Sequence, residues 1–254
     1  MAATGSGGQN PRPNPAPAEL TVMISGGFSP AYRQLLPEFE RTTGIAVATA
    51  SAASQGRGPN TMKAQLERGA RADVVILSRE GLSELMAAGR IAAGTDVDLA
   101  RVPIGASVQL GKPKPDVSTV DALKRTLLEA HAIAVPGSTS GIFLMEDVFP
   151  TLGLADKLAV KVGPRGSDAT AMVAAGEAAI VLAPVSELLG VAGIDYVGRL
   201  PPEVQLLQVF AAAIVAESDH RGEAKRLIEF LASAQAAAAI EQSGMEPLGN
   251  RATR

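Results

Sequence analysis

Small hydroxyl residues, glycines and arginines gather in six short loops, each of which follows a predicted strand. Glycine and serine let an anion approach the backbone closely, and helices that begin in such loops present free N–H groups and a partial positive charge. Arginine adds a planar guanidinium that pairs with carboxylates and oxyanions. The pattern predicts a site for a small anion, although each loop taken alone could equally be a turn or helix cap, or carry a solvated arginine. The candidate ligand-binding residues are Ser25, Gly26, Gly27, Ser51, Ser54, Arg57, Ser78, Arg79, Ser138, Thr139, Ser140, Gly141, Arg165 and Ser186.

None of these loops carries a familiar catalytic motif. The sequence has no Cys, which removes thiolate catalysis, disulfides and cysteine-ligated metals. We expect His131 and His220 to be structural or solvated, and Asp96 and Asp98 to form a solvated turn. The sequence contains no P-loop, no GxGxxG in a dinucleotide context and no GxSxG elbow. We therefore name no catalytic residue, no metal site and no cofactor.

The composition excludes several classes of partner. The 254 residues carry a net charge of -3, and only 3% of them are aromatic. Nucleic acids need a basic face or aromatic stacking platforms, so no nucleic acid partner is expected. No apolar run approaches the roughly 20 residues of a membrane-spanning helix.

Strand and helix signals alternate from residue 19 onward, which predicts an α/β fold whose mainly parallel sheets are flanked by helices. The clearest buried strand is 73–77. Extended runs over 102–110 and 204–215 predict two strands that cross between two lobes, and 222–239 predicts one long amphipathic helix. The other predicted strands are 20–24, 45–49, 131–135, 158–162 and 179–182.

The expected organisation is a clamshell with its ligand in the cleft, because ligands of such sheets bind outside the carboxyl ends of the strands. We expect lobe 1 over 19–102 and 207–254, and lobe 2 over 103–206. A disordered tail is expected over 1–18, where the composition cannot bury apolar surface and no signal-peptide core is present. The tail suits a mature exported chain whose signal has been removed, and a cytoplasmic protein is the alternative.

Several segments resemble the type II periplasmic binding proteins, in the branch nearest the molybdate-binding proteins. The segments are Ser25-Gly26-Gly27-Phe28, Phe39-Glu40-Arg41-Thr42-Thr43-Gly44, Leu66-Glu67-Arg68-Gly69, Ala72-Asp73-Val74-Val75-Ile76-Leu77, Lys112-Pro113-Lys114-Pro115-Asp116, Ser138-Thr139-Ser140-Gly141, Phe149-Pro150, Leu152-Gly153-Leu154 and Gly193-Ile194-Asp195-Tyr196-Val197-Gly198. The resemblance implies two lobes that close on one small anion, a periplasmic location, a monomer, and a membrane permease as partner.

The first of these segments also departs from the molybdate-binding pattern. Molybdate binders usually carry a serine-rich loop where this chain has Ser25-Gly26-Gly27. The Ser25-Gly26-Gly27-Phe28 sequence is similar to that of an offshoot of the family that includes aconitate isomerase, a cofactor-free enzyme that moves a proton on a tricarboxylate. Because a fold does not fix a function, three hypotheses stay open. The first is a solute-binding protein of an ABC-type importer for an oxyanion or a di- or tricarboxylate, the alternative is the isomerase, and the third is a sensor or scavenger without a transporter.

Overall fold

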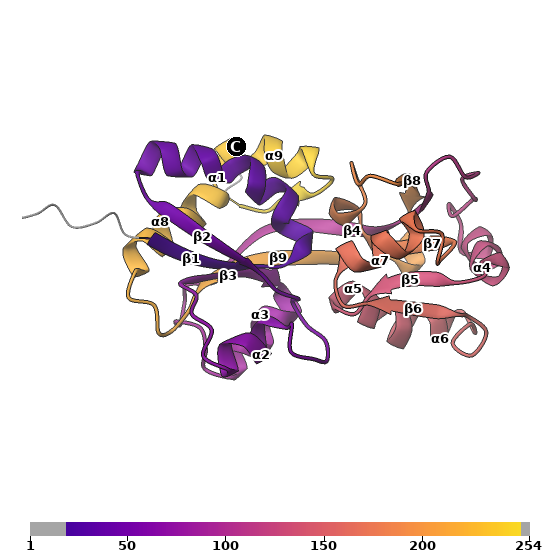
Figure 1. The fold of residues 1–254 in the computed structure, drawn as a ribbon, viewed down its shortest axis with the longest axis horizontal. Coiled ribbons are helices and arrows are strands. Elements are labelled where there is room, and N and C mark those ends of the chain that lie inside the picture. Colours follow the sequence, from indigo (N-terminus) through magenta and orange to yellow (C-terminus); the bar gives the residue numbers. More distant parts are fainter. Residues whose placement is uncertain (1–18, 250–254) are drawn as a thin grey trace, which may run out of the picture.

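The computed structural model describes residues 19–249, which form two lobes joined by the long strand β4 (Val97–Gln109) and the chain that returns into β9 (Leu207–Ile214) (Figure 1). We call residues 19–102 and 207–249 lobe 1 and residues 103–206 lobe 2. The α/β fold class is confirmed. The expected tail over 1–18 and residues 250–254, which were predicted to belong to lobe 1, lie outside the described part of the chain.

Lobe 1 is a mixed sheet with helices on both faces. Its strand order is β2-β1-β3-β9-β4, with β1 parallel to β2 and β3, and β9 antiparallel to its two neighbours. Strand β3 is buried along its whole length because it lies centrally between β1 and β9. The other elements of lobe 1 are β1 (Glu19–Ile24), α1 (Ser29–Thr43), β2 (Ala46–Ser51), α2 (Met62–Glu67), β3 (Val74–Ser78), α3 (Arg79–Ala87), α8 (Arg221–Leu231), α9 (Ala237–Gln242) and β10 (Glu246–Pro247).

Lobe 2 repeats this plan on a smaller scale. Strands β5, β6 and β7 are parallel, and β4 closes the sheet by pairing antiparallel with β7 and β8. The same strand β4 therefore belongs to both sheets, pairing with β9 as far as Pro103 and with β7 from Ile104. The elements of lobe 2 are α4 (Val120–Glu129), β5 (Ile133–Pro136), α5 (Thr139–Phe143), a π-helical turn (Leu144–Val148), α6 (Phe149–Thr151), β6 (Val160–Gly163), α7 (Gly166–Ala174), β7 (Ile180–Pro184) and β8 (Ile194–Arg199).

Separate hydrophobic cores stabilise the two lobes. In lobe 1, α1, α8 and α9 cover one face of the sheet with residues such as Phe39 and Leu227, and α2 and α3 cover the other with residues such as Met62 and Leu82. In lobe 2 the apolar residues of β4, β5 and β7 are buried among α4, α5 and α7 (Figure 1). Burial of both faces explains why strands such as 73–77 are continuously apolar.

The structure corrects the predicted helix over 222–239. Helix α8 ends at Leu231, and α9 begins only at Ala237. Between them Ser233 adopts an extended conformation, and its hydroxyl donates a hydrogen bond to the carbonyl of Phe230, 2.7 Å away. Such side-chain bonds to the backbone compete with continuation of a helix.

Strand β8 was not predicted as a strand, and it is held by its pairing with β4.

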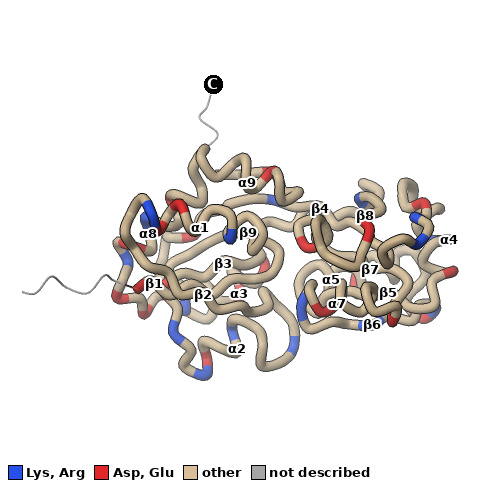
Figure 2. Tube along the Cα trace, turned by 45° about the horizontal axis from the view of Figure 1, so that its top comes forward, with Lys and Arg blue, Asp and Glu red and all other residues tan. Residues whose placement is uncertain are grey.

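No helix among residues 19–249 combines the length and the apolar character needed to span a membrane. Lys and Arg residues are interspersed with Asp and Glu residues along the traces of both lobes (Figure 2). This distribution matches the small net charge of the chain.

Candidate functional site

The loops at the carboxyl ends of strands from both lobes converge on a small cavity between the lobes. Its volume is about 20 Å³, which is room for about one water molecule. The lining comes from the loops after β1, β2, β5, β6 and β7 and from β9. The lining residues are Ser25, Gly26, Gly27, Ala52, Ala53, Ser54, Pro136, Ser138, Ser140, Arg165, Gly166, Pro184, Glu187, Gln208 and Phe210.

Half of the predicted ligand-binding residues line this cavity. Several of them stand where helices begin, since Ser25 precedes the 3-10 turn Gly26–Phe28 that leads into α1, Ser138 precedes α5 and Arg165 precedes α7. Three helical segments therefore begin at the cavity, and the start of a helix carries unsatisfied N–H groups and partial positive charge. The predicted residues brought together here are Ser25, Gly26, Gly27, Ser54, Ser138, Ser140 and Arg165.

Close packing explains the glycines of the first loop. A Cβ on Gly27 would lie against the buried ring of Phe210, 2.7 Å from its Cε2 atom. A Cβ on Gly26 would collide with the carboxyl group of Glu187 from lobe 2. The Ser25-Gly26-Gly27 turn thus brings lobe 1 backbone against side chains that a larger residue would displace.

Buried polar atoms near this cavity lack partners. The hydroxyl of Ser25 and the side-chain oxygen of Gln208 line the cavity, and neither has a hydrogen-bond partner among residues 19–249. Ser186, at the end of β7, has a buried hydroxyl in the same condition. Buried polar groups are normally satisfied, so unsatisfied ones beside one small cavity leave hydrogen-bonding capacity there for an ordered water or a ligand.

Ser78, Thr139 and Gln55 form a hydrogen-bonded bridge between the lobes instead of lining the cavity. The Ser78 hydroxyl accepts a bond from the N–H of Gly81 and lies 2.7 Å from the Thr139 hydroxyl, which donates to the Gln55 side-chain oxygen at 2.7 Å. Ser78 and Gln55 belong to lobe 1 and Thr139 to lobe 2. The bridge therefore links the two lobes next to the cavity.

The remaining predicted residues lie outside the cavity. Gly141 packs its Cα against the backbone of Pro136, Ser51 is exposed at the end of β2, and Arg57 is exposed in a groove of about 590 Å³ at the outer edge between the lobes. Ser186 is buried beside Glu187. Sequence spacing places residues after a strand, but it does not say which side of the loop faces the cleft.

Arg79 is engaged away from the cavity. Its guanidinium donates to Asp96 at 2.7 Å and to Asp98 at 2.8 Å. The bond from Arg79 holds the pKa of the Asp96 carboxyl below its usual value. Asp98 is exposed and Asp96 partly exposed, as the prediction of a solvated turn requires, but both carboxylates pair with Arg79, which was predicted to face the ligand.

No role is predicted for Glu187 from the sequence, although its neighbour Ser186 is a predicted ligand-binding residue. Glu187 ends a 3-10 turn directly after β7, and its carboxyl group lies between Gly26 of lobe 1 and Gly166 at the start of α7. Burial raises the pKa of Glu187 from 4.5 to about 7. No hydrogen bond or ion pair to its carboxyl group is found among residues 19–249. A carboxyl group without a partner among residues 19–249 therefore lies where the loops that line the cavity from both lobes meet.

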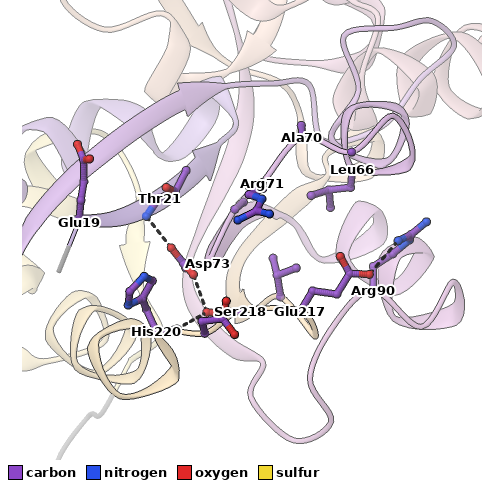
Figure 3. Close-up of a pocket in the computed structure, with 14 residues that line it drawn as sticks. Glu19, Thr21, Leu66, Ala70, Arg71, Asp73, Arg90, Glu217, Ser218 and His220 are labelled. Atoms are coloured by element: carbon purple, nitrogen blue, oxygen red, sulfur yellow. Dashed lines mark hydrogen bonds and ion pairs between the residues drawn. The ribbon is translucent and has the colours of Figure 1, made fainter.

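A second, larger pocket of about 470 Å³ lies at the opposite end of the lobe 1 strands (Figure 3). Its buried carboxylate, Asp73, accepts bonds from the N–H of Thr21 at 2.8 Å and from the hydroxyl of Ser218 at 2.7 Å. The backbone N–H of His220 donates to the same hydroxyl at 3.1 Å. Asp73 thus ties the starts of β1 and β3 to the loop before α8, which is a structural role.

Replacing Asp73 by alanine is expected to lower the free energy of unfolding by about 2 kcal/mol, because the N–H of Thr21 and the hydroxyl of Ser218 lose a charged acceptor. Urea unfolding measures the loss. Ligand affinity, measured by calorimetry, should stay within about twofold of the unsubstituted protein, because the pocket lies away from the interlobe cavity. Unchanged stability with weakened ligand binding would contradict this assignment.

No group of three or more His, Cys, Asp or Glu among residues 19–249 is arranged to hold a metal ion. His131 is exposed at the start of the lobe 2 strand region, and His220 precedes α8 beside the larger pocket. Neither histidine lines the interlobe cavity.

Comparison with known proteins identifies the fold and the family. Two solved structures share the architecture: the periplasmic molybdate-binding protein of Azotobacter vinelandii (TM-score 0.72, 20% identity, 89% of this chain and 98% of that one) and the sulfate-binding protein SubI of Mycobacterium tuberculosis (TM-score 0.73, 20% identity, 91% and 87%). The predicted type II periplasmic-binding-protein fold is thereby confirmed.

A relative found by sequence has a higher identity to this chain than these two structures have. An aconitate isomerase from a Pseudomonas species is 38% identical over 230 residues, which cover 90% of this chain and 88% of the relative. The model of the family described as bacterial extracellular solute-binding protein matches residues 20–246. The protein therefore belongs to the bacterial extracellular solute-binding protein family.

Proposed function

We propose that the protein binds a small organic polycarboxylate between its lobes. The observation that carries this choice is the free carboxyl group of Glu187 inside the interlobe cavity. A tetrahedral dianion such as molybdate or sulfate would bring two charges against Glu187 in a site shielded from water, where like charges repel strongly. A polycarboxylate is larger than these oxyanions and carries C–H groups, so it can place its hydrocarbon part, and not a charge, next to Glu187.

A polycarboxylate fits the two kinds of surface in the cleft. Its carboxylates bind at the starts of the helical segments that follow Ser25, Ser138 and Arg165. One of them also accepts a hydrogen bond from the hydroxyl of Ser25, which has no partner among residues 19–249. Its hydrocarbon part lies against Glu187. The cavity holds about one water molecule when the lobes are closed, so the lobes open to admit such a ligand.

We further propose that the bound polycarboxylate is aconitate and that the protein interconverts its cis and trans forms. The relative that is 38% identical over 90% of the chain, an aconitate isomerase, favours this activity. The second candidate is a periplasmic binding protein that delivers the anion to a membrane permease of an ABC-type importer. The family and the molybdate- and sulfate-binding structural neighbours favour that role. Both roles are compatible with the predicted monomer, and gel filtration tests that prediction.

Calorimetry tests the ligand class. The protein is titrated with trans-aconitate, cis-aconitate, the saturated analogue tricarballylate, molybdate and sulfate. Micromolar binding of the tricarboxylates with at least about tenfold weaker binding of the oxyanions is the expected result. Tight molybdate or sulfate binding, or no binding of any tricarboxylate below about 1 mM, would reject the proposal. Proton NMR of the same mixtures separates turnover from mere binding.

Replacing Thr139 by valine is expected to weaken trans-aconitate binding about tenfold, because the closed form loses the bridge to Ser78 and Gln55. Thr126→Val is the matched control, since the Thr126 hydroxyl bonds to the Asp116 carbonyl within lobe 2. Calorimetry compares the two variants with the unsubstituted protein. Equal affinities for all three proteins would mean that the bridge does not contribute to closure.

A further inference from the structure

The interlobe cavity contains one acid–base side chain among residues 19–249. The other ionisable group in its lining is Arg165, whose guanidinium stays protonated at all working pH values and donates to Asp168 at 3.2 Å. Serine hydroxyls, a glutamine amide, alanines and glycines make up most of the remainder. A reaction in this cavity that moves a proton therefore depends on Glu187.

We propose that Glu187 is the catalytic residue that carries the proton in an allylic isomerisation of an unsaturated tricarboxylate. This inference rests on the isomerase activity proposed above and adds the residue and the chemical step. The position of Glu187 supports this role, because its carboxyl group lies between Gly26 of lobe 1 and Gly166, the first residue of α7 in lobe 2, and all three residues line the cavity.

The step balances without a cofactor or co-reactant. The Glu187 carboxylate removes a proton from the methylene carbon next to the double bond, and the electron pair of that C–H bond spreads over the three allylic carbons and an attached carboxylate. The protonated Glu187 then returns the proton to the carbon at the other end of the allylic unit. The new double bond joins the former methylene carbon to the central carbon, so one C–H bond breaks and one forms.

This route explains how one side chain changes the geometry of a double bond. The new double bond forms along a bond that was single in the substrate, and the cavity fixes the conformation about that bond before the proton moves. No rotation about an existing double bond is needed. A single carboxyl group on one side of the allylic unit reaches both terminal carbons, so a second acid–base residue is unnecessary.

The surroundings of Glu187 support the same role. The developing negative charge is delocalised into substrate carboxylates, which face the starts of the 3-10 turn Gly26–Phe28, of α5 and of α7. Arg165 and Asp168 at the start of α7 pair with each other, and the charged residues of β4, Asp98 and Arg101, pair with Arg79 and Glu246. Burial raises the pKa of Glu187 to about 7, so the same group accepts a proton and returns it near neutral pH.

The test uses Glu187→Gln, which preserves shape and removes the proton acceptor, with Glu241→Gln as matched control on exposed α9. Each protein is incubated with cis- or trans-aconitate in deuterated water, and proton NMR follows isomerisation and deuterium uptake. Glu187→Gln should slow both by at least about 100-fold and bind trans-aconitate within about tenfold of the unsubstituted protein. Glu241→Gln should match the unsubstituted protein in both respects.

The outcomes separate this inference from the function on which it rests. If the unsubstituted protein binds no tricarboxylate, the proposed function fails. If it binds trans-aconitate but catalyses neither isomerisation nor exchange, or if Glu187→Gln keeps the full rate, the role of Glu187 is overturned while binding stands. Glu187→Asp adds a readout that a structural role would not move: the rate should recover partly, with deuterium still appearing in recovered substrate.

Discussion

The folded protein is expected to lose up to about 3 kcal/mol of stability from Glu187 as the pH rises from 4.5 to about 7, and Glu187→Gln should remove this loss. Below pH 4.5 the carboxyl group is protonated in both the folded and the unfolded chain. Between these values the unfolded chain releases the proton while the folded chain keeps it, so stability falls with rising pH. Above about pH 7 both states are ionised and the loss is complete.

Urea unfolding at several pH values, without ligand, measures this difference. The variant and the unsubstituted protein should be equally stable near pH 4, and the variant should be more stable at pH 8. The Asp96 carboxyl, whose pKa is lowered by Arg79, contributes in the opposite direction and only at acidic pH, and it is common to both proteins. The free energy of unfolding of Glu241→Gln should change with pH as it does in the unsubstituted protein. If the free energy of unfolding of Glu187→Gln also follows that of the unsubstituted protein at every pH, the Glu187 carboxyl is not held in a buried site.

Replacing Gly141 by alanine is expected to lower the free energy of unfolding by about 3 kcal/mol and to abolish measurable ligand binding. A Cβ at this position would overlap the carbonyl oxygen of Pro136 and lie 2.8 Å from its carbonyl carbon. Backbone atoms cannot rotate away as a side chain does, so α5 must shift from the end of β5. That shift moves Ser138 and Ser140 out of the cavity lining.

The control for this substitution is Gly222→Ala. A Cβ at Gly222 meets no atom within 4 Å, and the residue lies in the first turn of α8. The control should be as stable as the unsubstituted protein or more stable by about 0.5 kcal/mol, because alanine favours helix more than glycine. Thermal and urea unfolding compare the two substitutions. Equal stability of both variants would show that the approach of α5 to β5 leaves room for a side chain.

The elements near the cleft were largely predictable from sequence, because local signals there agree with the fold. The apolar run at 73–77 became the buried β3, and the helix after Ser29 ends where Gly44 takes a left-handed conformation with φ 70°. Where local and tertiary preferences disagree, prediction failed. The alanine-rich stretch around Ser233 is compatible with helix throughout, yet the chain turns there so that Ile240 can reach the lobe 1 core.

Residue chemistry alone could not say which polar groups face the ligand. Arg79 and Asp98 are 19 residues apart, and their pairing depends on how β4 passes the start of α3. Thr139 was expected to bind an anion, but it forms a bridge to Ser78 across the lobes. Such contacts depend on long-range packing, which the spacing of residues within one loop does not encode.

The sequence by itself determined the α/β class, the alternation of strands and helices, and the gathering of small hydroxyl and glycine loops at strand ends, because these follow from hydrophobic periodicity and backbone chemistry. Only the tertiary structure decided the character of the site. It brought Glu187 between Gly26 and Gly166, left its carboxyl group without a partner among the described residues, and raised its pKa to about 7. Desolvation depends on what surrounds a side chain in three dimensions, and no local pattern around Glu187 records those neighbours.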